Sequence, residues 1–426
     1  MIRSIINRTD YILLFSTFLP YLMINEGIRI EHLVVYSLFL FFLFKGYIFN
    51  FKKKSFTSII FIFFGIILLV SIGSLVNIDP NNITFLSNFE NYVETLILFL
   101  ILNSLLVNKK HFTVERMLKI NTFFHVLLAL NTCLIFIEIF TPYADFFQKF
   151  YVKMEDGGYR VGTDSMGRYM GIFNQPVESG FAYSLGLLTW LYNFVKIKKN
   201  NRIKQGILLV LILIGGIVSV SKVFLIGGIL LFTVMFFLIG SFKNKITMLV
   251  FSLILLTFLV PIFINDWKGY SILENQISEF TTEFSISNVT AGRIGKEDGI
   301  YGLIVNKDSS IYFMGKGYTV GDLPFLDSEY VQIFYQGGGF ALILYFTMII
   351  RIFIKYHTIN SKFYTERMLL LAILVLALFT AIGGPVFLMN RVRVFFFLQL
   401  FFIYQMSKVK TNISSREKFK KYDQLV

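Results

Sequence analysis

Residues 207–239 read ILLVLILIGGIVSVSKVFLIGGILLFTVMFFLI, and the main polar interruption of this run, Ser219, Ser221 and Lys222, lies near its middle. As one helix the run would be about 50 Å long, whereas the hydrocarbon core of a bilayer is about 30 Å thick. A single span would also put the basic segments 196–204 and 243–245 on opposite sides of the membrane. We therefore predict two membrane-spanning helices joined by a tight hairpin at 219–222.

The rest of the chain has the same character. It has 426 residues, of which 55% are hydrophobic, including 51 Phe and 22 Tyr, and its mean hydropathy is +0.68. Apolar residues run continuously and do not alternate, which favours helices over a barrel. We predict an all-α polytopic membrane protein with about twelve transmembrane helices. The expected spans are 10–25 (retained, since no small-residue cleavage site follows it), 31–49, 56–76, 91–107, 117–140, 178–195, 206–220, 223–240, 246–264, 328–352, 367–387 and 392–407.

The net charge of +14 follows the expected topology. Basic residues gather in alternate loops, at 52–54, 109–110, 196–204, 243–245, 351–355 and 408–421. The positive-inside rule makes these loops cytoplasmic. We expect a multi-pass protein of the cytoplasmic membrane with both termini in the cytoplasm and the bilayer itself as a partner. The charge does not indicate a nucleic-acid partner.

This topology divides the chain into segments. They are transmembrane helices at 1–140, an extracytoplasmic loop at 141–177, helices at 178–264, a large extracytoplasmic loop at 265–326, helices at 327–407 and a basic cytoplasmic tail at 408–426. Within the large loop, Leu273, Ile277, Phe280 and Phe284 recur at helical spacing. They predict a helix that packs on the outer ends of the spans or lies in the interface, with a lid over a lipid-linked substrate as the functional alternative.

The chain has few residues that could form disulfides or bind a metal ion. Cys133 is the single cysteine, so no disulfide can form within one chain. The four histidines, His32, His111, His125 and His357, are far apart in the sequence, and we expect no metal site built from them. No cofactor is expected.

The first long outer loop ends in a segment with several helix-start signals. Residues 168–180 read RYMGIFNQPVESG. Pro176 suits the first turn of a helix and Glu178 suits a capping position. The exposed N-terminus of the sixth span would favour an anion, with Arg168 just before it. The alternative is ordinary interfacial capping with an arginine that extends to water.

The pattern Arg-x-x-Gly-x-x-x-x-Pro-x-x-x-Gly of 168–180 resembles the outer-loop motif of the O-antigen polymerase and O-antigen ligase family. Further segments resemble that family's motifs in the same order: Ser221-Lys222 between two spans, Gly292-Arg293 and Gly315-Lys316-Gly317 in the large loop, and DSEYVQIFYQG at 327–337. The likeness covers roughly 140 to 340 and implies a GT-C-like fold. Ligases of the family typically carry His where this chain has Asp327, which favours the polymerase side.

The resemblance implies transfer of an oligosaccharide from a polyprenyl pyrophosphate to an acceptor hydroxyl. Arginine and lysine suit the developing charge of a diphosphate leaving group. The residues expected to bind the pyrophosphate are Arg168, Lys222, Arg293 and Lys316, and Arg293 is also a catalytic candidate. Arg391 and Arg393, in a short outer turn, are secondary candidates for the phosphate site or for lipid headgroups.

A base must also take the proton of the acceptor hydroxyl. Asp327 and Glu329 are the first candidates, and Glu178 and Tyr330 are secondary site candidates. A pyrophosphate leaving group needs no protonating acid, so one base suffices. The alternative is that these acids only pair with the arginines at the membrane face.

The predicted function is polymerisation of polyprenyl-pyrophosphate-linked repeat units into O-antigen, capsule or a related surface polysaccharide at the outer face of the bacterial cytoplasmic membrane. Its partners would be the lipid-linked donor and acceptor and, by the resemblance, a chain-length regulator. One alternative is an O-antigen ligase that transfers the glycan to lipid A core or another acceptor. A second is a flippase or transporter for lipid-linked oligosaccharides, although the paired repeats and broken helices of many transporters are not visible in the sequence. A non-catalytic scaffold is the third.

Overall fold

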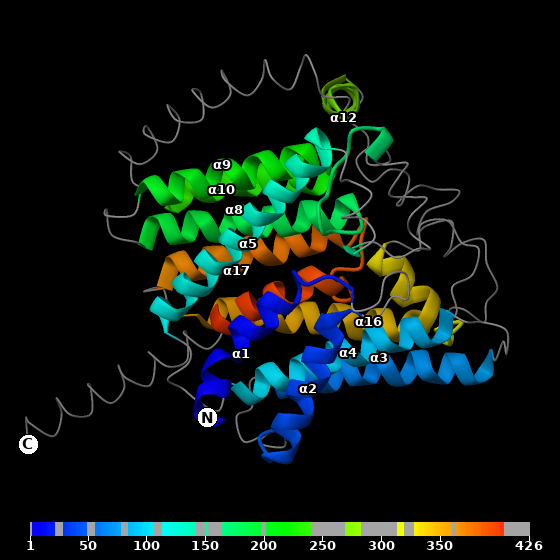
Figure 1. The fold of residues 1–426 in the computed structure, drawn as a ribbon. Helices are drawn as coiled ribbons and strands as arrows, with labels where there is room; N and C mark the ends of the chain where they lie inside the picture. Colours follow the sequence, from blue (N-terminus) through cyan, green and yellow to red (C-terminus); the bar gives the residue numbers. More distant parts are fainter. Residues whose placement is uncertain are drawn as a thin grey trace, which may run out of the picture.

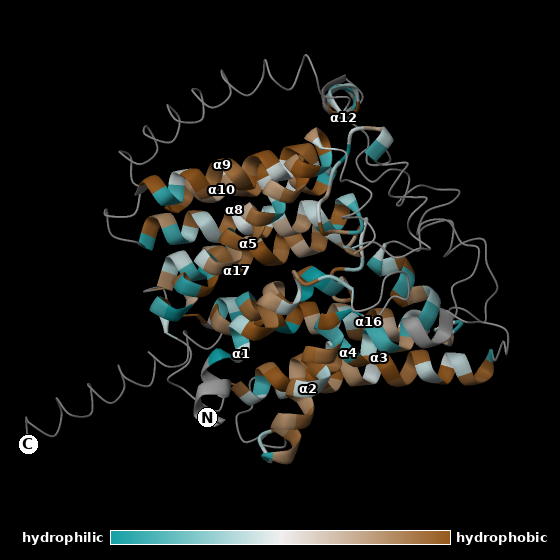
Figure 2. Ribbon diagram, in the orientation of Figure 1, coloured by the Kyte–Doolittle hydropathy of each residue, from teal (hydrophilic) through white to brown (hydrophobic). Residues whose placement is uncertain are grey.

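A computed structural model of the chain describes residues 2–21, 29–48, 56–77, 84–105, 113–141, 150–151, 164–196, 202–239, 269–282, 313–318, 328–359 and 363–403. All regular elements within these ranges are helices, which confirms the all-α prediction. Most of them lie side by side in a bundle, and hydrophobic residues run along most of their length (Figures 1 and 2).

The helices follow the predicted apolar runs closely. They are α1 (Ile2–Ser16), α2 (Ile30–Phe44), α3 (Thr57–Val76), α4 (Thr84–Leu105), α5 (Val114–Phe140), α8 (Pro176–Lys196), α9 (Arg202–Val218), the π-helix η3 (Val223–Gly228), α10 (Ile229–Ile239), α12 (Tyr270–Thr282), α16 (Glu329–Thr358) and α17 (Tyr364–Thr380). Residues 390–403 form a further helix. The predicted span 246–264 lies outside the described residues.

Three of these helices, α3, α5 and α16, are long and apolar enough to cross a membrane. The apolar helices α2, α9 and the η3–α10 pair are shorter. A membrane protein is therefore supported, and the twelve-span topology stays a prediction. The first boundary was wrong: the predicted span was 10–25, but α1 ends at Ser16. The hydroxyls of Ser16 and Thr17 donate to the carbonyls of Leu13 and Leu14 in its last turn.

The hairpin at 219–222 is confirmed by the packing of its two arms on α8. Trp190 of α8 donates its indole N–H to the carbonyl of Gln205, 2.8 Å away, near the start of α9. Ser221, after the end of α9, packs on Gly180 in the first turn of α8. Residues after the turn then run back along α8, where Phe232 reaches Trp190 again. The two arms are antiparallel, as the length argument predicted.

Helix α8 is the centre of the bundle. It contacts α5, α9, η3, α10 and α17, and nearly all its residues from Pro176 to Asn193 are buried. Because α8 is buried around its whole circumference, with several polar side chains among the buried ones, it occupies an interior position. Its N-terminal turn is consequently surrounded by other segments, and the candidate site is built around it.

Helix α12 confirms part of the prediction for the large outer loop. It covers Tyr270–Thr282, and Leu273 is half-buried and packs against the hydrophobic core. Phe284 lies outside the described residues, and the side chains of Ile277 and Phe280 are not described. In Figure 1 α12 lies at one edge of the bundle, away from the central helices.

Candidate functional site

The N-terminal turn of α8 is held by Glu178, as its predicted capping position requires. Pro176 is the first helical residue, where its missing N–H costs nothing. One carboxylate oxygen of Glu178 accepts the backbone N–H of Asn174 at 3.0 Å, and the other accepts the backbone N–H of Arg391 at 3.3 Å. Glu178 therefore connects the start of α8 to the start of the helix at 390–403.

Arg168 lies at the predicted hairpin turn. Its Nη2 donates to the carbonyl of Val220 at 3.0 Å, and the backbone N–H of Tyr169 donates to the carbonyl of Val218 at 3.3 Å. Val220 has a positive φ of 43°, an unusual conformation for a β-branched residue. Arg168 and Lys222, two of the predicted phosphate-binding residues, thus come from segments that contact each other. Ser221 of the same turn packs on Gly180 of α8.

Arg391 lies on the other side of the α8 turn, where it is 2% exposed. Its Nη1 donates to the carbonyls of Thr17 at 2.9 Å and Leu19 at 3.1 Å. Within the described part of the chain, its Nε and Nη2 have no hydrogen-bond partner. Its guanidinium lies 5.8 Å from the ring centre of Tyr21 and 5.5 Å from that of Tyr151. Burial raises the pKa of Tyr151, so the phenol stays neutral and offers its ring face to the cation.

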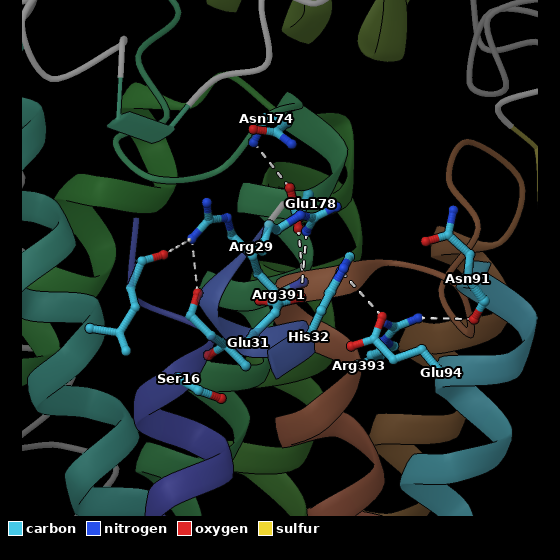
Figure 3. Close-up of polar contacts among 12 residues, drawn as sticks. Ser16, Arg29, Glu31, His32, Asn91, Glu94, Asn174, Glu178, Arg391 and Arg393 are labelled. Carbon is cyan, nitrogen blue, oxygen red and sulfur yellow. Dashed lines mark hydrogen bonds and ion pairs between the residues drawn. The ribbon is translucent and has the colours of Figure 1, made fainter. Parts of the chain in front are cut away.

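Arg391 belongs to a charge cluster of six buried side chains: Arg29, Glu31, His32, Glu94, Arg391 and Arg393 (Figure 3). Arg393 pairs with Glu94 and donates to Thr95 Oγ1 at 3.0 Å and to the carbonyl of Asn91 at 3.2 Å. Arg29 Nη1 lies 3.5 Å from Glu31 Oε1, and its guanidinium lies 5.7 Å from the ring centre of Tyr21. Arg29 and Arg391 therefore share one aromatic ring.

Sequence reasoning found Arg391, Arg393 and Glu178 as secondary candidates, but it missed Arg29, Glu31, His32 and Glu94. A signal was present. Glu94 lies inside the predicted span 91–107, and His32 lies inside the predicted span 31–49, with Glu31 at its first position. Ionisable residues within membrane spans are energetically costly and usually functional. The positions of Glu94 and His32 within predicted spans were therefore the signal that could have pointed to this cluster.

Lys316 belongs to a short segment, 313–318, that docks elsewhere. Its backbone N–H donates to the carbonyl of Tyr335 at 2.7 Å, and the N–H of Gly317 donates to the carbonyl of Gln336 at 2.9 Å. The same segment contacts α3, because the N–H of Tyr318 donates to Ser74 Oγ at 2.8 Å. Lys316 is half-buried at this junction of α3 and α16.

Glu329 and Tyr330 stand at the start of α16. Glu329 is fully buried, with Oε1 accepting the backbone N–H of Phe387 at 3.1 Å and Oε2 accepting the hydroxyl of Tyr345 at 3.1 Å. Tyr330 donates its hydroxyl to the carbonyl of Leu378 at 2.9 Å. The bonds to Phe387 and Leu378 tie α16 to the end of α17 and the turn after it. The remaining candidates, Arg293 and Asp327, lie outside the described residues, and the catalytic roles stay predictions.

No protein-family model, curated protein or solved structure matches this chain significantly.

Proposed function

We propose that this chain is a GT-C-like, twelve-span glycosyltransferase of the bacterial cytoplasmic membrane that polymerises polyprenyl-pyrophosphate-linked repeat units at the outer face. The growing glycan would leave its lipid diphosphate and join the acceptor hydroxyl of the next lipid-linked unit. The proposal rests on one observation: segments that carry Arg168, Lys222 and Arg391, from distant parts of the sequence, meet at the first turn of α8.

The arrangement around that turn suits a diphosphate. Arg168 bonds to Val220 in the hairpin turn, and Ser221, next to Lys222, packs on Gly180 of α8. The backbone N–H of Arg391 contacts the same turn through Glu178. Arg391 is buried, and two of its guanidinium nitrogens have no hydrogen-bond partner among the described residues. Buried N–H donors without partners are costly, and a phosphate group would satisfy them in the bidentate manner that guanidinium allows.

Catalysis in this scheme comes mainly from fixed positive charge. Negative charge grows on the diphosphate as the glycosidic bond breaks, and preorganised cations in a water-poor site lower the energy of that state. The acceptor proton goes to a carboxylate, for which Asp327 remains the first candidate. Glu178 and Glu329 already accept two hydrogen bonds each, and both fix neighbouring backbone or side-chain groups.

The direct test uses purified full-length protein in lipid vesicles with synthetic lipid-linked repeat units. The wild-type chain should produce a ladder of glycan lengths, and Arg391→Ala and Arg168→Ala should each slow its formation about 100-fold or more, by analogy with other electrostatic stabilisers. Lys119→Ala, at an exposed site on α5, is the matched charge control and should retain the ladder. A wild-type protein that binds the substrate but yields only single units would refute the polymerase.

A lipid-linked oligosaccharide flippase is the second candidate. The buried charge cluster favours it, because ionisable groups inside a helical bundle often mark transport paths. The two functions differ in cells that carry Arg391→Ala. Loss of polymerisation leaves single lipid-linked units at the outer face, whereas loss of flipping leaves them on the cytoplasmic side. Labelling intact cells with a membrane-impermeant lectin distinguishes the outcomes, because the lectin binds only lipid-linked units at the outer face. A ligase would instead move glycan to an added lipid A core acceptor.

A further inference from the structure

We infer that Glu31, His32 and Glu94 form a binding site for a divalent transition-metal ion such as Mn²⁺, a property beyond the proposed function. One ligand atom from each residue lies within 4.8 Å of the others, and all three residues are buried. Glu31 and His32 are in the first turn of α2, and Glu94 lies in α4, which packs on α2. One imidazole with two carboxylates suits Mn²⁺, Fe²⁺ or Zn²⁺, whereas Mg²⁺ and Ca²⁺ prefer oxygen ligands alone.

Two atoms of these residues are open to a metal ion. Glu31 Oε2 and His32 Nε2 have no hydrogen-bond partner within the residues that the structure describes. His32 Nε2 lies 3.3 Å from Glu94 Oε2 without forming a hydrogen bond. Ligand atoms that are each about 2.1 Å from one metal ion lie roughly 3.0–3.4 Å from each other. The separation of these two atoms therefore fits neighbours in one coordination shell.

The other nitrogen of His32 has the support that a metal-bound histidine usually has. His32 Nδ1 lies 3.3 Å from Glu90 Oε1, and Tyr36 donates its hydroxyl to the same oxygen at 3.3 Å. Metal-binding histidines generally donate their second ring N–H to a carboxylate, which fixes the tautomer. A proton on Nδ1 leaves the lone pair of Nε2 available to a metal ion.

Glu94 can take part in the metal site while it stays paired with its arginine. Arg393 already pairs with Glu94. A carboxylate has about four lone-pair sites, so Glu94 can bridge Arg393 and a metal ion.

Binding is tested on the purified full-length protein in detergent, stripped with a chelator and titrated with Mn²⁺ in the absence of any lipid-linked substrate. Pulsed EPR detects nitrogen that is bound directly to Mn²⁺. We expect one Mn²⁺ per chain with a histidine-nitrogen coupling that changes when the protein carries ¹⁵N-histidine. His32→Gln should abolish the coupling and weaken binding at least tenfold, and Glu90→Gln should weaken binding about 10–100-fold while keeping the coupling.

Glu115→Gln removes an exposed carboxylate on α5 and should change neither affinity nor spectrum. Binding without histidine nitrogen, or a nitrogen signal that survives His32→Gln, would overturn the inference. So would the absence of bound Mn²⁺. If His32→Gln fails to fold, a His111→Gln/His357→Gln variant is compared with the wild-type protein instead. The histidine-nitrogen coupling must then persist in both proteins. Because no substrate is present, this result is independent of whether the chain polymerises glycans.

Discussion

Arg393 and Glu94 show what a single pair of residues contributes inside this bundle. Their side chains are 1% and 3% exposed, so both charges have lost their contact with water. Arg393 compensates with further bonds to Asn91 and Thr95 on the same helix as Glu94. A buried pair of this kind need not stabilise the fold relative to apolar residues, but breaking it leaves one unpaired charge behind.

The pair makes a thermodynamic prediction. Glu94→Gln and Arg393→Gln should each lower the free energy of unfolding by about 3–5 kcal/mol, because each leaves one buried charge uncompensated. The double variant should lose clearly less than the sum of the single losses, since it removes both charges. Equilibrium unfolding of metal-free protein in detergent measures all three. Strictly additive losses would contradict the interpretation.

The matched surface pair is Glu115 and Lys119, whose side chains are 77% and 66% exposed. Water already solvates both groups, so Glu115→Gln should leave the unfolding curve unchanged. A large effect of Glu115→Gln would mean that removing a charge destabilises the protein whether or not the charge is buried. Burial would then not explain the losses in the cluster.

At the scale of elements, the segment 313–318 joins α3 to α16 through a break in α16. Gly338 has a φ of 73°, which interrupts the helix. The carbonyls of Tyr335 and Gln336 accept bonds from Lys316 and Gly317, as expected where a kink disturbs the helical ladder. Gly317 itself has a φ of 79° and lies against the backbone of Ser74 in α3. The predicted Gly-Lys-Gly motif therefore serves close backbone packing in this structure, whatever Lys316 binds.

Gly317→Ala should destabilise this junction through both backbone strain and collision with Ser74. Two other glycines separate the causes. Gly46→Ala has only the strain, because its φ is 67° and nothing lies within 4 Å of an added Cβ. Gly206→Ala has neither and lies in α9, where alanine is the better helix former by about 0.5–1 kcal/mol. Thermal unfolding should therefore rank the variants Gly317→Ala, Gly46→Ala and Gly206→Ala from least to most stable.

For the whole molecule, contacts between helix ends define one common end of the bundle. The start of α8 meets the start of the helix at 390–403 through Glu178. The backbone N–H of Glu329 at the start of α16 donates to the carbonyl of Ala381 after α17, 2.9 Å away. The end of α3 meets the segment 313–318. These are the ends that the positive-inside rule assigns to the extracytoplasmic side.

Cysteine labelling tests that assignment. In a Cys133→Ser background, Met314→Cys should react with an impermeant maleimide in intact cells, because Met314 is 54% exposed at the common end. Glu115→Cys, exposed at the start of α5 near the opposite end, should react only after the membrane is opened. The reverse pattern would invert the topology and exclude a reaction at the outer face.

The sequence predicts the helices of this molecule better than it predicts the candidate site. The hairpin at 219–222 followed from the length of one apolar run, and Glu178 followed from its spacing to Pro176, because both are local properties. The expectation that Arg168 and Lys222 share a site rested on analogy with a motif order and stays a prediction, although Arg168 bonds to Val220 in the same turn. The position of α1 was wrong by several residues, since apolar periodicity does not mark the point at which Ser16 and Thr17 end the helix.

By itself, the sequence determined that the chain is helical, where most helices lie and which loops carry the positive charge, because hydrophobic burial and backbone hydrogen bonding in a helix involve neighbours within a few residues. Only the tertiary structure decided that Arg29, Glu94 and Arg391 meet in one buried cluster (Figure 3). Their partners lie as many as 374 residues away in the chain, and no local pattern encodes which helix ends pack together. That choice depends on the balance of desolvation and pairing among all the buried charges at once.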